Sequence, residues 1–319
     1  QIKFLNLENP ADLQKFRQAL SSYPVGGVGI SINSGYTRPV HHHLIFQNLD
    51  IYRGGFGGFA DDTQFLNNHV HGAIELKAGY GWYFNGARAT IRGNDVHDNV
   101  FGFHLYNGYA SSEMDLTDSI IENNRIYNNG GQWYHFSSGT IGTNEGDGLL
   151  VQHARNNLIR NNIVFGNRGW GIRLQGSNLE AYNNTVYGNR RQGIYSYDGS
   201  SNVIRNNISY ANFGEDGYPG EIYIGSGNVH SHNFTSDPKF VDPSLYDFRL
   251  QSDSPVRDQG MVLSEVTTDF ADNPRSDGAP DIGAHEYGTG TDTEKPTDFE
   301  PRERCNCGEG ELIESLGDT

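Results

Sequence analysis

The sequence predicts an all-β solenoid, in which one short unit of chain is repeated and stacked. An eight-residue segment recurs, as RNNIVFGN at 160–167, YNNTVYGN at 182–189 and RNNISYAN at 205–212. The 41 glycines, together with 18 tyrosines and 17 phenylalanines, suit short strands and turns better than helices. With 319 residues, the chain is long enough to be stable through burial alone, without disulfides or metals.

The repeated segment predicts a tight turn in every coil. Further copies begin at Leu66, Arg92 and Glu122, and the second Asn or its equivalent falls at positions 68, 94, 124, 162, 184 and 207. These spacings of 26, 30, 38, 22 and 23 residues are typical of a solenoid with insertions in some coils. Asn favours turns, and we expect its amide to bond the coils above and below.

Each unit is expected to contribute strands with alternating side chains. In RNNIVFGN, Val164 is predicted to point into the core. A second strand follows a glycine in each coil, with apolar residues one and three positions later. These second strands are expected to begin at Gly72, Gly102, Gly148, Gly171 and Gly193.

These motifs resemble the right-handed parallel β-helix proteins of the pectate-lyase-like superfamily, over about Val40 to Tyr287. The resemblance implies a right-handed parallel β-helix of coils of about 22–30 residues. It implies less about activity, because the superfamily includes polysaccharide lyases, glycoside hydrolases, C5-epimerases and phage tailspikes. The chain lacks the YGFDPH stretch of alginate epimerases, whose Asp and His positions are taken by His104 and Tyr106. It also lacks the NTD, DD, GHG and RIK motifs of polygalacturonases.

The chain divides into three predicted regions. Residues 1–39 form an N-terminal segment with a possible capping helix over Glu8–Leu20, and residues 40–288 form the β-helix with its C-terminal cap. Residues 289–319 are predicted to be an acidic linker or tail leading towards a further domain. This tail holds both cysteines, Cys305 and Cys307, so no disulfide is expected in the main body.

Charge and hydropathy exclude several partners. A net charge of -16 argues against nucleic acid, and no apolar run is long enough for membrane insertion. The start at Gln1, instead of Met, suits a processed, extracellular protein that is secreted or held at the cell surface.

A ligand is expected on the outward face of the second strands, where two columns of side chains are predicted. The first column comprises Glu75, His104, Leu150, Arg173 and Tyr195. The second column comprises Lys77, Tyr106, Gln152, Gln175 and Tyr197. The insertion Gly130–Asp147 is expected to bring Trp133, Tyr134 and His135 to the rim of this face. Aromatic rings beside polar groups suit stacking and hydrogen bonding to sugars, so the predicted partner is a polysaccharide.

A lyase or epimerase needs a cation for the uronate carboxylate, a base for the C5 proton and an acid. Arg173 or Lys77 is the expected cation, His104 or His153 the base and Tyr106 the acid. The remaining residues of the face and rim are expected to bind substrate, namely Glu75, Gln152, Gln175, Tyr195, Tyr197, Trp133, Tyr134 and His135. A hydrolase is less favoured, because Glu75 is the one acid in the two columns and two carboxylates are needed. The alternative is a non-catalytic glycan-binding, adhesion or tailspike-like β-helix.

No cofactor is required by this chemistry, and no metal site is assigned. Glu145 and Asp147 in the insertion, with Asp115 and Asp118 in the preceding coil, leave calcium open.

Overall fold

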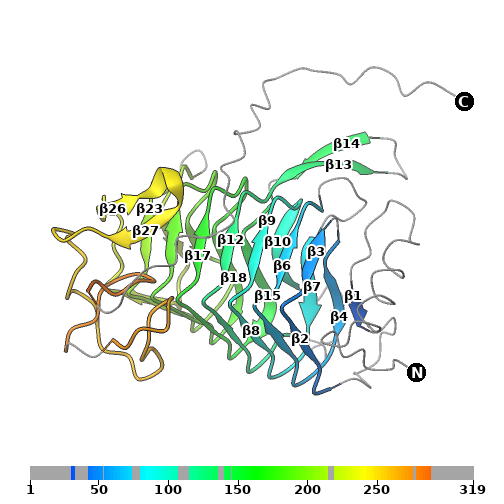
Figure 1. The fold of residues 1–319 in the computed structure, drawn as a ribbon, viewed down its shortest axis with the longest axis horizontal. Coiled ribbons are helices and arrows are strands. Elements are labelled where there is room, and N and C mark those ends of the chain that lie inside the picture. Colours follow the sequence, from blue (N-terminus) through cyan, green and yellow to red (C-terminus); the bar gives the residue numbers. More distant parts are fainter. Residues whose placement is uncertain are drawn as a thin grey trace, which may run out of the picture.

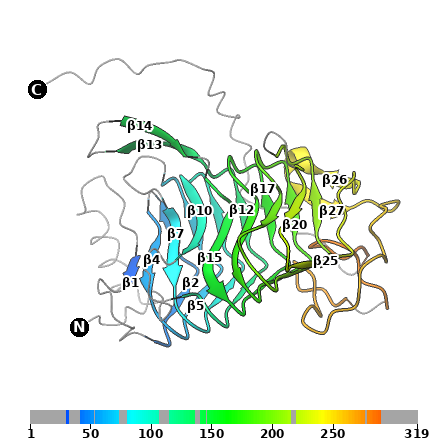
Figure 2. The same ribbon diagram turned by 180° about the vertical axis from the view of Figure 1, so that it is seen from behind.

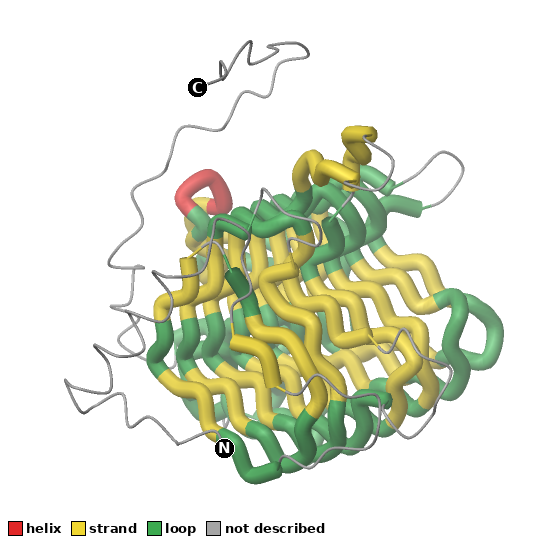
Figure 3. Tube along the Cα trace, turned by 90° about the vertical axis from the view of Figure 1, so that its right-hand side faces the viewer, coloured by secondary structure: helices red, strands yellow, loops and turns green. Residues whose placement is uncertain are grey.

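Three parallel sheets wind around one axis and form the walls of a solenoid (Figure 1). The computed structural model describes residues 30–32, 42–52, 54–73, 80–106, 115–135, 140–144, 146–214, 219–275 and 278–288. Each coil contributes one strand to each sheet, in the chain order sheet 2, sheet 3, sheet 1. The predicted parallel β-helix is therefore confirmed, and successive strands form continuous bands when the molecule is turned by 90° (Figure 3).

The described residues place eight strands in sheet 1, eight in sheet 2 and seven in sheet 3. Sheet 1 comprises β1 (Ile30–Ile32), β4 (Phe56–Phe59), β7 (Tyr80–Asn85), β10 (Phe101–Tyr106), β15 (Leu149–Arg155), β18 (Ile172–Ser177), β21 (Ile194–Ser196) and β24 (Ile222–Ile224). Sheet 2 comprises β2 (Ile45–Gln47), β5 (Gln64–Leu66), β8 (Thr90–Arg92), β11 (Ile120–Glu122), β16 (Leu158–Arg160), β19 (Glu180–Tyr182), β22 (Val203–Arg205) and β25 (Val229–Ser231). Sheet 3 comprises β3 (Asp50–Tyr52), β6 (His69–His71), β9 (Asp95–His97), β12 (Arg125–Tyr127), β17 (Ile163–Phe165), β20 (Thr185–Tyr187) and β23 (Ile208–Tyr210).

The core is a column of apolar side chains enclosed by the three sheets. Val164 lies in it with no exposed surface, as its place in the repeat predicts. The middle residue of each short strand points inward, so the same position recurs in the core from coil to coil. Aromatic residues fill the N-terminal part of the column, where Phe65 and Trp82 pack edge to face.

The Asn pair of the repeat performs two separate tasks. Its first residue adopts a left-handed conformation, with φ of 52° at Asn161 and 53° at Asn123, which Asn tolerates better than most residues. Its second residue is buried and donates to its counterpart in the next coil, with Asn162 Nδ2 2.9 Å or 3.0 Å from two carbonyl oxygens and 3.0 Å from Asn184 Oδ1. This Asn ladder runs through residues 68, 94, 124, 162, 184, 207 and 233 and confirms the predicted role of the repeat.

The last Asn of the octet forms a second ladder at the next corner. Asn167 Nδ2 donates to Asn189 Oδ1 at 2.9 Å, and Asn189 continues to Asn212 at the same distance. The preceding Gly166 and Gly188 have φ of 63° and 62°, so each corner pairs a left-handed residue with a ladder Asn. The octet therefore encodes one strand of sheet 3 with a matching corner at either end.

The glycine at the start of several strands of sheet 1 is required by close packing. A Cβ at Gly171 would lie 2.4 Å from Val186 Cγ1 and 2.6 Å from the carbonyl oxygen of Gly193. Any larger residue would push the next coil away, which explains why glycine recurs at this position.

The C-terminal segment lies against the outside of the last coils. It begins with β26 (Phe240–Asp242), the 3-10 helix η2 (Pro243–Leu245) and β27 (Asp247–Leu250). Phe240 and Phe248 pack with Phe165, and together they form a second apolar cluster on the outward side of sheet 3. These elements are at one end of the molecule in both ribbon views (Figures 1 and 2).

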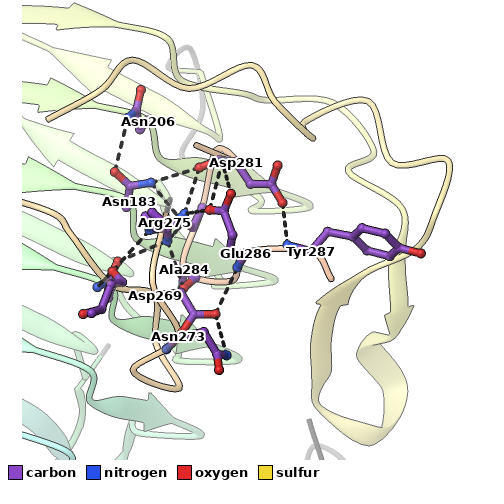
Figure 4. A network of polar contacts seen from close by, with 12 residues as sticks. Asn183, Asn206, Asp269, Asn273, Arg275, Asp281, Ala284, Glu286 and Tyr287 are labelled. Atoms are coloured by element: carbon purple, nitrogen blue, oxygen red, sulfur yellow. Dashed lines mark hydrogen bonds and ion pairs between the residues drawn. The ribbon is translucent and has the colours of Figure 1, made fainter. Parts of the chain in front are cut away.

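Residues 256–275 and 278–288 follow the corner between sheets 2 and 3, where a buried polar network fixes them (Figure 4). Arg275 is almost completely buried and pairs with Glu286 at 2.6 Å. The first Asn of the pair donates from several coils to backbone carbonyls of this segment, including Asn161 to Thr268 at 2.8 Å and Asn183 to Asp281 at 3.0 Å. The repeat thus also attaches the C-terminal segment.

The large insertion forms an antiparallel hairpin of β13 (Gly131–His135) and β14 (Thr140–Asn144). It projects from the coil wall in Figures 1 and 2. The predicted helix Glu8–Leu20 and the tail 289–319 lie outside the described residues. None of the helices within the described ranges has the length and apolar character needed to cross a membrane.

Candidate functional site

The outward face of sheet 1 carries the two columns that the sequence predicts. Register pairs His104 with Leu150, Leu150 with Arg173 and Arg173 with Tyr195. In the second column, Tyr106 pairs with Gln152, and Gln152 pairs with Gln175. The predicted alignment of the strands from Gly102, Gly148 and Gly171 is therefore confirmed, and that of the strand from Gly193 is confirmed at Tyr195. Because β21 ends at Ser196, the predicted place of Tyr197 beside Gln175 stays a prediction.

The alignment is wrong at the first coil. The strand beside β10 is β7, so His104 lies next to Tyr83 and the predicted strand from Gly72 is not its partner. Both stretches contain a glycine followed by alternating side chains, and the sequence pattern does not distinguish them. Glu75 and Lys77 lie outside the described residues.

Arg173 is the centre of a cluster of aromatic and charged groups on this face. Its guanidinium carbon lies 4.2 Å from the ring centroid of Trp170 and 5.9 Å from that of Tyr195. Arg191 also contacts the indole, at 4.1 Å, so two guanidinium groups stack on one ring. One quarter of the Arg173 side chain remains exposed and available to a ligand.

Asp147 is the acidic partner of this cluster and precedes β15 by two residues. Its Oδ2 lies 3.6 Å from Arg173 Nη1, and its Oδ1 accepts the backbone N–H of Trp170 at 3.2 Å. Burial raises the pKa of Asp147 to about 6, although Arg173, the Trp170 N–H and Arg191 favour the ionised form. The side chain is 8% exposed, and its raised pKa brings it closer to the range that suits proton transfer near neutral pH.

A group of tyrosines extends the site towards the C-terminal coils. Tyr195 and Tyr223 are adjacent in register and stack at 5.7 Å, and Tyr197 stacks on Tyr223 at 5.4 Å. Tyr197 is half exposed. Gln175 Nε2 donates to Asp198 Oδ2 at 2.5 Å, which places an amide and a carboxylate beside these rings.

The environment of His104 makes it a weak base. The ring is 9% exposed, between Tyr83 and Phe101 at centroid distances of 5.4 Å. Burial and the charge of Arg173 lower the pKa of His104 to about 3, so the imidazole stays neutral at physiological pH. Its predicted role as the base stays a prediction, and a base with this pKa gives little driving force for proton removal.

The other predicted residues lie at different points of the face. His153 is exposed and has a φ of 50° at an irregularity in the pairing of β15 with β18, whereas Gln152 is half-buried in the regular part. Tyr106 and the hairpin residues Trp133, Tyr134 and His135 have defined strand positions, but their side chains lie outside the description. Their predicted contacts stay predictions.

The sequence interpretation missed Trp170, Arg191, Asp198 and Tyr223. Asp147 was considered for calcium and not for this cluster. Asp147 and Trp170 occupy the same position in successive coils, directly before the glycine that opens each strand of sheet 1. An alignment of the residues directly before these glycines would have shown that Asp147 and Trp170 are neighbours.

The acids considered for calcium have basic or amide partners where they are described. Asp115 lies 2.8 Å from an Arg155 nitrogen, Asp118 accepts from Asn156 at 3.1 Å, and Asp147 faces Arg173. Glu145 lies outside the described residues. Calcium at this place stays a prediction.

A family model described as the right handed beta helix region matches residues 57–236, which is more than half of the chain. The chain belongs to this family. The right-handed β-helix matches several solved structures at low sequence identity. A sequence comparison with curated proteins finds no match.

Two solved structures illustrate the similarity. The chain is 17% identical to the periplasmic alginate epimerase AlgG with a TM-score of 0.44, over 61% of this chain and 47% of that one. It is 18% identical to pectate lyase Pel9A with a TM-score of 0.47, over 85% of this chain and 90% of that one. The chain thus spans about half the length of the epimerase structure that it matches.

Proposed function

We propose that this β-helix protein binds an acidic polysaccharide along the outward face of sheet 1 and acts on it as a lyase or epimerase. The observation that carries the proposal is the cluster of Arg173, Asp147 and Trp170, with the exposed tyrosines beside it. A ligand of this kind is extracellular, and an extracellular location is part of the proposal.

Arg173 is the proposed partner of the uronate carboxylate. Its position is fixed by stacking on Trp170, and its distance of 3.6 Å from Asp147 is longer than a good charge-assisted hydrogen bond. A substrate carboxylate can therefore accept hydrogen bonds from the exposed guanidinium. Neutralising that carboxylate makes the C5 proton of the sugar more acidic.

Asp147 is the proposed acid–base group, because its pKa of about 6 suits proton transfer near neutral pH. In a lyase, removal of the C5 proton forms the C4–C5 double bond and releases the oxygen at C4. In an epimerase, a proton returns to C5 from the opposite face. Tyr106, or Tyr195 next to Arg173, is the proposed proton donor on the other side.

The overall charge of -16 does not oppose a polyanion at this place. Arg173 and Arg191 lie within 4.2 Å of one indole ring, where two positive charges face one carboxylate, Asp147. Charges more than about 10 Å away are largely screened at physiological salt, so the local arginines dominate close to the site.

A second candidate is a binding protein without catalysis. The half-exposed Tyr197, which stacks on Tyr223, favours it, because tyrosine faces bind sugar rings without any acid or base. Product analysis distinguishes the two candidates.

The experiment incubates the protein with a panel of uronic-acid polysaccharides and records the ultraviolet absorbance of unsaturated products. Proton exchange at C5, followed by NMR in deuterated water, detects epimerisation on the same panel. Affinity electrophoresis measures binding separately from turnover.

Arg173→Gln should abolish turnover and weaken binding by about tenfold or more, because a charge-assisted hydrogen bond is lost. Arg205→Gln on sheet 2 is the matched control and should leave both unchanged. Binding without any product across the panel would support the binding protein. Neither binding nor product would contradict the proposed function.

A further inference from the structure

A cluster of three histidines lies on the outward side of sheet 3, over coils that precede the apolar cluster of the C-terminal segment. His69 and His71 are on β6, on either side of the fully buried Val70. His97 is on β9, where register places it beside His71. The alternation of the strands thus directs all three rings outward.

The ring nitrogens are close enough to share one ion. One nitrogen from each histidine lies within 4.8 Å of the others, and His69 Nε2 is 2.7 Å from His97 Nε2. In a tetrahedral zinc site with Zn–N distances of about 2.0–2.1 Å, ligand nitrogens lie about 3.3 Å apart. The 2.7 Å contact and the 4.8 Å limit lie on either side of this spacing.

A carboxylate beside His97 selects the tautomer that a metal needs. Asp98 Oδ2 lies 2.8 Å from His97 Nδ1, so a hydrogen on Nδ1 leaves the lone pair of the ring on Nε2. This Nε2 lies 2.7 Å from His69 Nε2, which brings two candidate ligand atoms together.

We propose that His69, His71 and His97 bind one divalent transition-metal ion, of which Zn²⁺ suits the ligands best. Imidazole favours zinc, copper and nickel over calcium and magnesium, which prefer oxygen. Asp50 Oδ1, 3.0 Å from His71 Nε2, or water completes the coordination. The ion would join β6 to β9, and Asp50 would extend the connection to β3.

The site is accessible and separate from the polysaccharide face. The side chain of His69 is 44% exposed, so an ion can enter from solvent. The cluster belongs to sheet 3, whereas Arg173 belongs to sheet 1. A failure to bind metal would therefore not count against the proposed glycan binding, and a failure to bind glycan would not count against the metal site.

The test titrates metal-free, untagged full-length protein with Zn²⁺ by calorimetry and with Co²⁺ by absorption spectroscopy. We expect one Zn²⁺ per chain and the intense visible bands of tetrahedral Co²⁺. His69→Gln and His97→Gln should weaken Zn²⁺ binding at least tenfold, and Asp98→Asn about tenfold, because it orients His97. His230→Gln, an exposed histidine on β25, is the matched control and should bind as the wild type does.

Circular dichroism checks the folding of each variant. Should His97→Gln misfold, because His97 stacks on Tyr127 at 4.6 Å, His71→Gln replaces it in the comparison. Absence of stoichiometric binding, or binding that survives in His69→Gln and His71→Gln, would overturn the proposal. A Co²⁺ spectrum identical to that of the aqueous ion would do the same.

Discussion

Two columns of aromatic side chains run along the outside of this β-helix, and they differ in what covers them. On sheet 3, Tyr127 stacks on Phe165 at 4.8 Å, and Tyr187 follows in register. Phe240 and Phe248 of the C-terminal segment cover this column, which is part of an apolar cluster. The aromatic column on sheet 3 is therefore a packing interface between the β-helix and the C-terminal segment.

The column on sheet 1 has a similar ladder arrangement but a different environment. Tyr195 and Tyr223 stack in the same way, next to the charged groups of Arg173 and Asp147. Tyr197 is 52% exposed. Repeated aromatic residues therefore do not identify a ligand site by themselves. Exposure and neighbouring charge distinguish the proposed binding column from the packing column.

Detaching the C-terminal segment should have the largest effect. Arg275→Gln leaves Glu286 buried without its ionic partner, and we expect a loss of about 3–5 kcal/mol in the free energy of unfolding. Chemical denaturation measures it. Arg249→Gln breaks the more exposed pair with Asp247 and should cost about 1 kcal/mol or less. Equal losses in the two variants would contradict the structural role of the buried network.

Truncation in the covered column should cost slightly less. Phe165→Ala removes a ring that is 2% exposed and contacts Tyr127 and Phe248, so the expected loss is about 3–4 kcal/mol. Thermal and chemical unfolding measure it. A loss below about 1 kcal/mol would mean that this column does not hold the segment in place.

Asp147 should make the stability depend on pH by an intermediate amount. Burial raises its pKa from 3.8 to about 6, so between these values the folded protein retains a proton that the unfolded chain has lost. The contribution of this group to the free energy of unfolding therefore falls as pH rises through that window and is constant above it. The full change is about 3 kcal/mol, at 1.36 kcal/mol per pKa unit.

The comparison of wild type with Asp147→Asn isolates this contribution. The difference between their free energies of unfolding should vary between pH 4 and pH 6 and level off above pH 7. Parallel curves over the whole range would show that the pKa of Asp147 is close to its ordinary value.

Truncation in the open column should have the smallest effect on stability. Tyr197→Ala should change the free energy of unfolding by less than about 1 kcal/mol, because half of the side chain is already exposed. Binding of the polysaccharide should weaken by about five- to tenfold, through loss of a stacking surface. A large loss of stability with unchanged binding would reverse the assignment of the two columns.

Most of the fold could be predicted from the sequence, because every coil repeats the same turn chemistry. The Asn ladder, the inward Val164 and the recurring glycine at the start of sheet 1 strands follow from local rules of period and turn geometry. The Asn pair does not show by itself which of its residues is left-handed and which is in the ladder, because most copies have Asn at both positions. The copy with Gly93 before Asn94 is the signal that could have separated them, since glycine favours positive φ. The attachment of Thr268 to Asn161 could not be foreseen either, since the two residues are 107 positions apart in the sequence.

The candidate site could be predicted in part. The predicted neighbours on sheet 1 are confirmed where the coils are regular, as for Arg173 and Tyr195. The predicted alignment was wrong at the first coil, because two stretches that begin with glycine fit the same pattern. The structure pairs β10 with β7, and not with the stretch from Gly72. The low pKa of His104 and the raised pKa of Asp147 depend on burial in three dimensions, which no spacing in the sequence reveals.

The central claim is that the open column around Arg173 is where a polysaccharide binds. Affinity electrophoresis of the wild type, Arg173→Gln and Arg205→Gln in gels containing uronic-acid polysaccharides tests it most directly. The account predicts retardation of the wild type and of Arg205→Gln, and its loss in Arg173→Gln. Retardation that is the same in all three proteins, or absent in all, would contradict it.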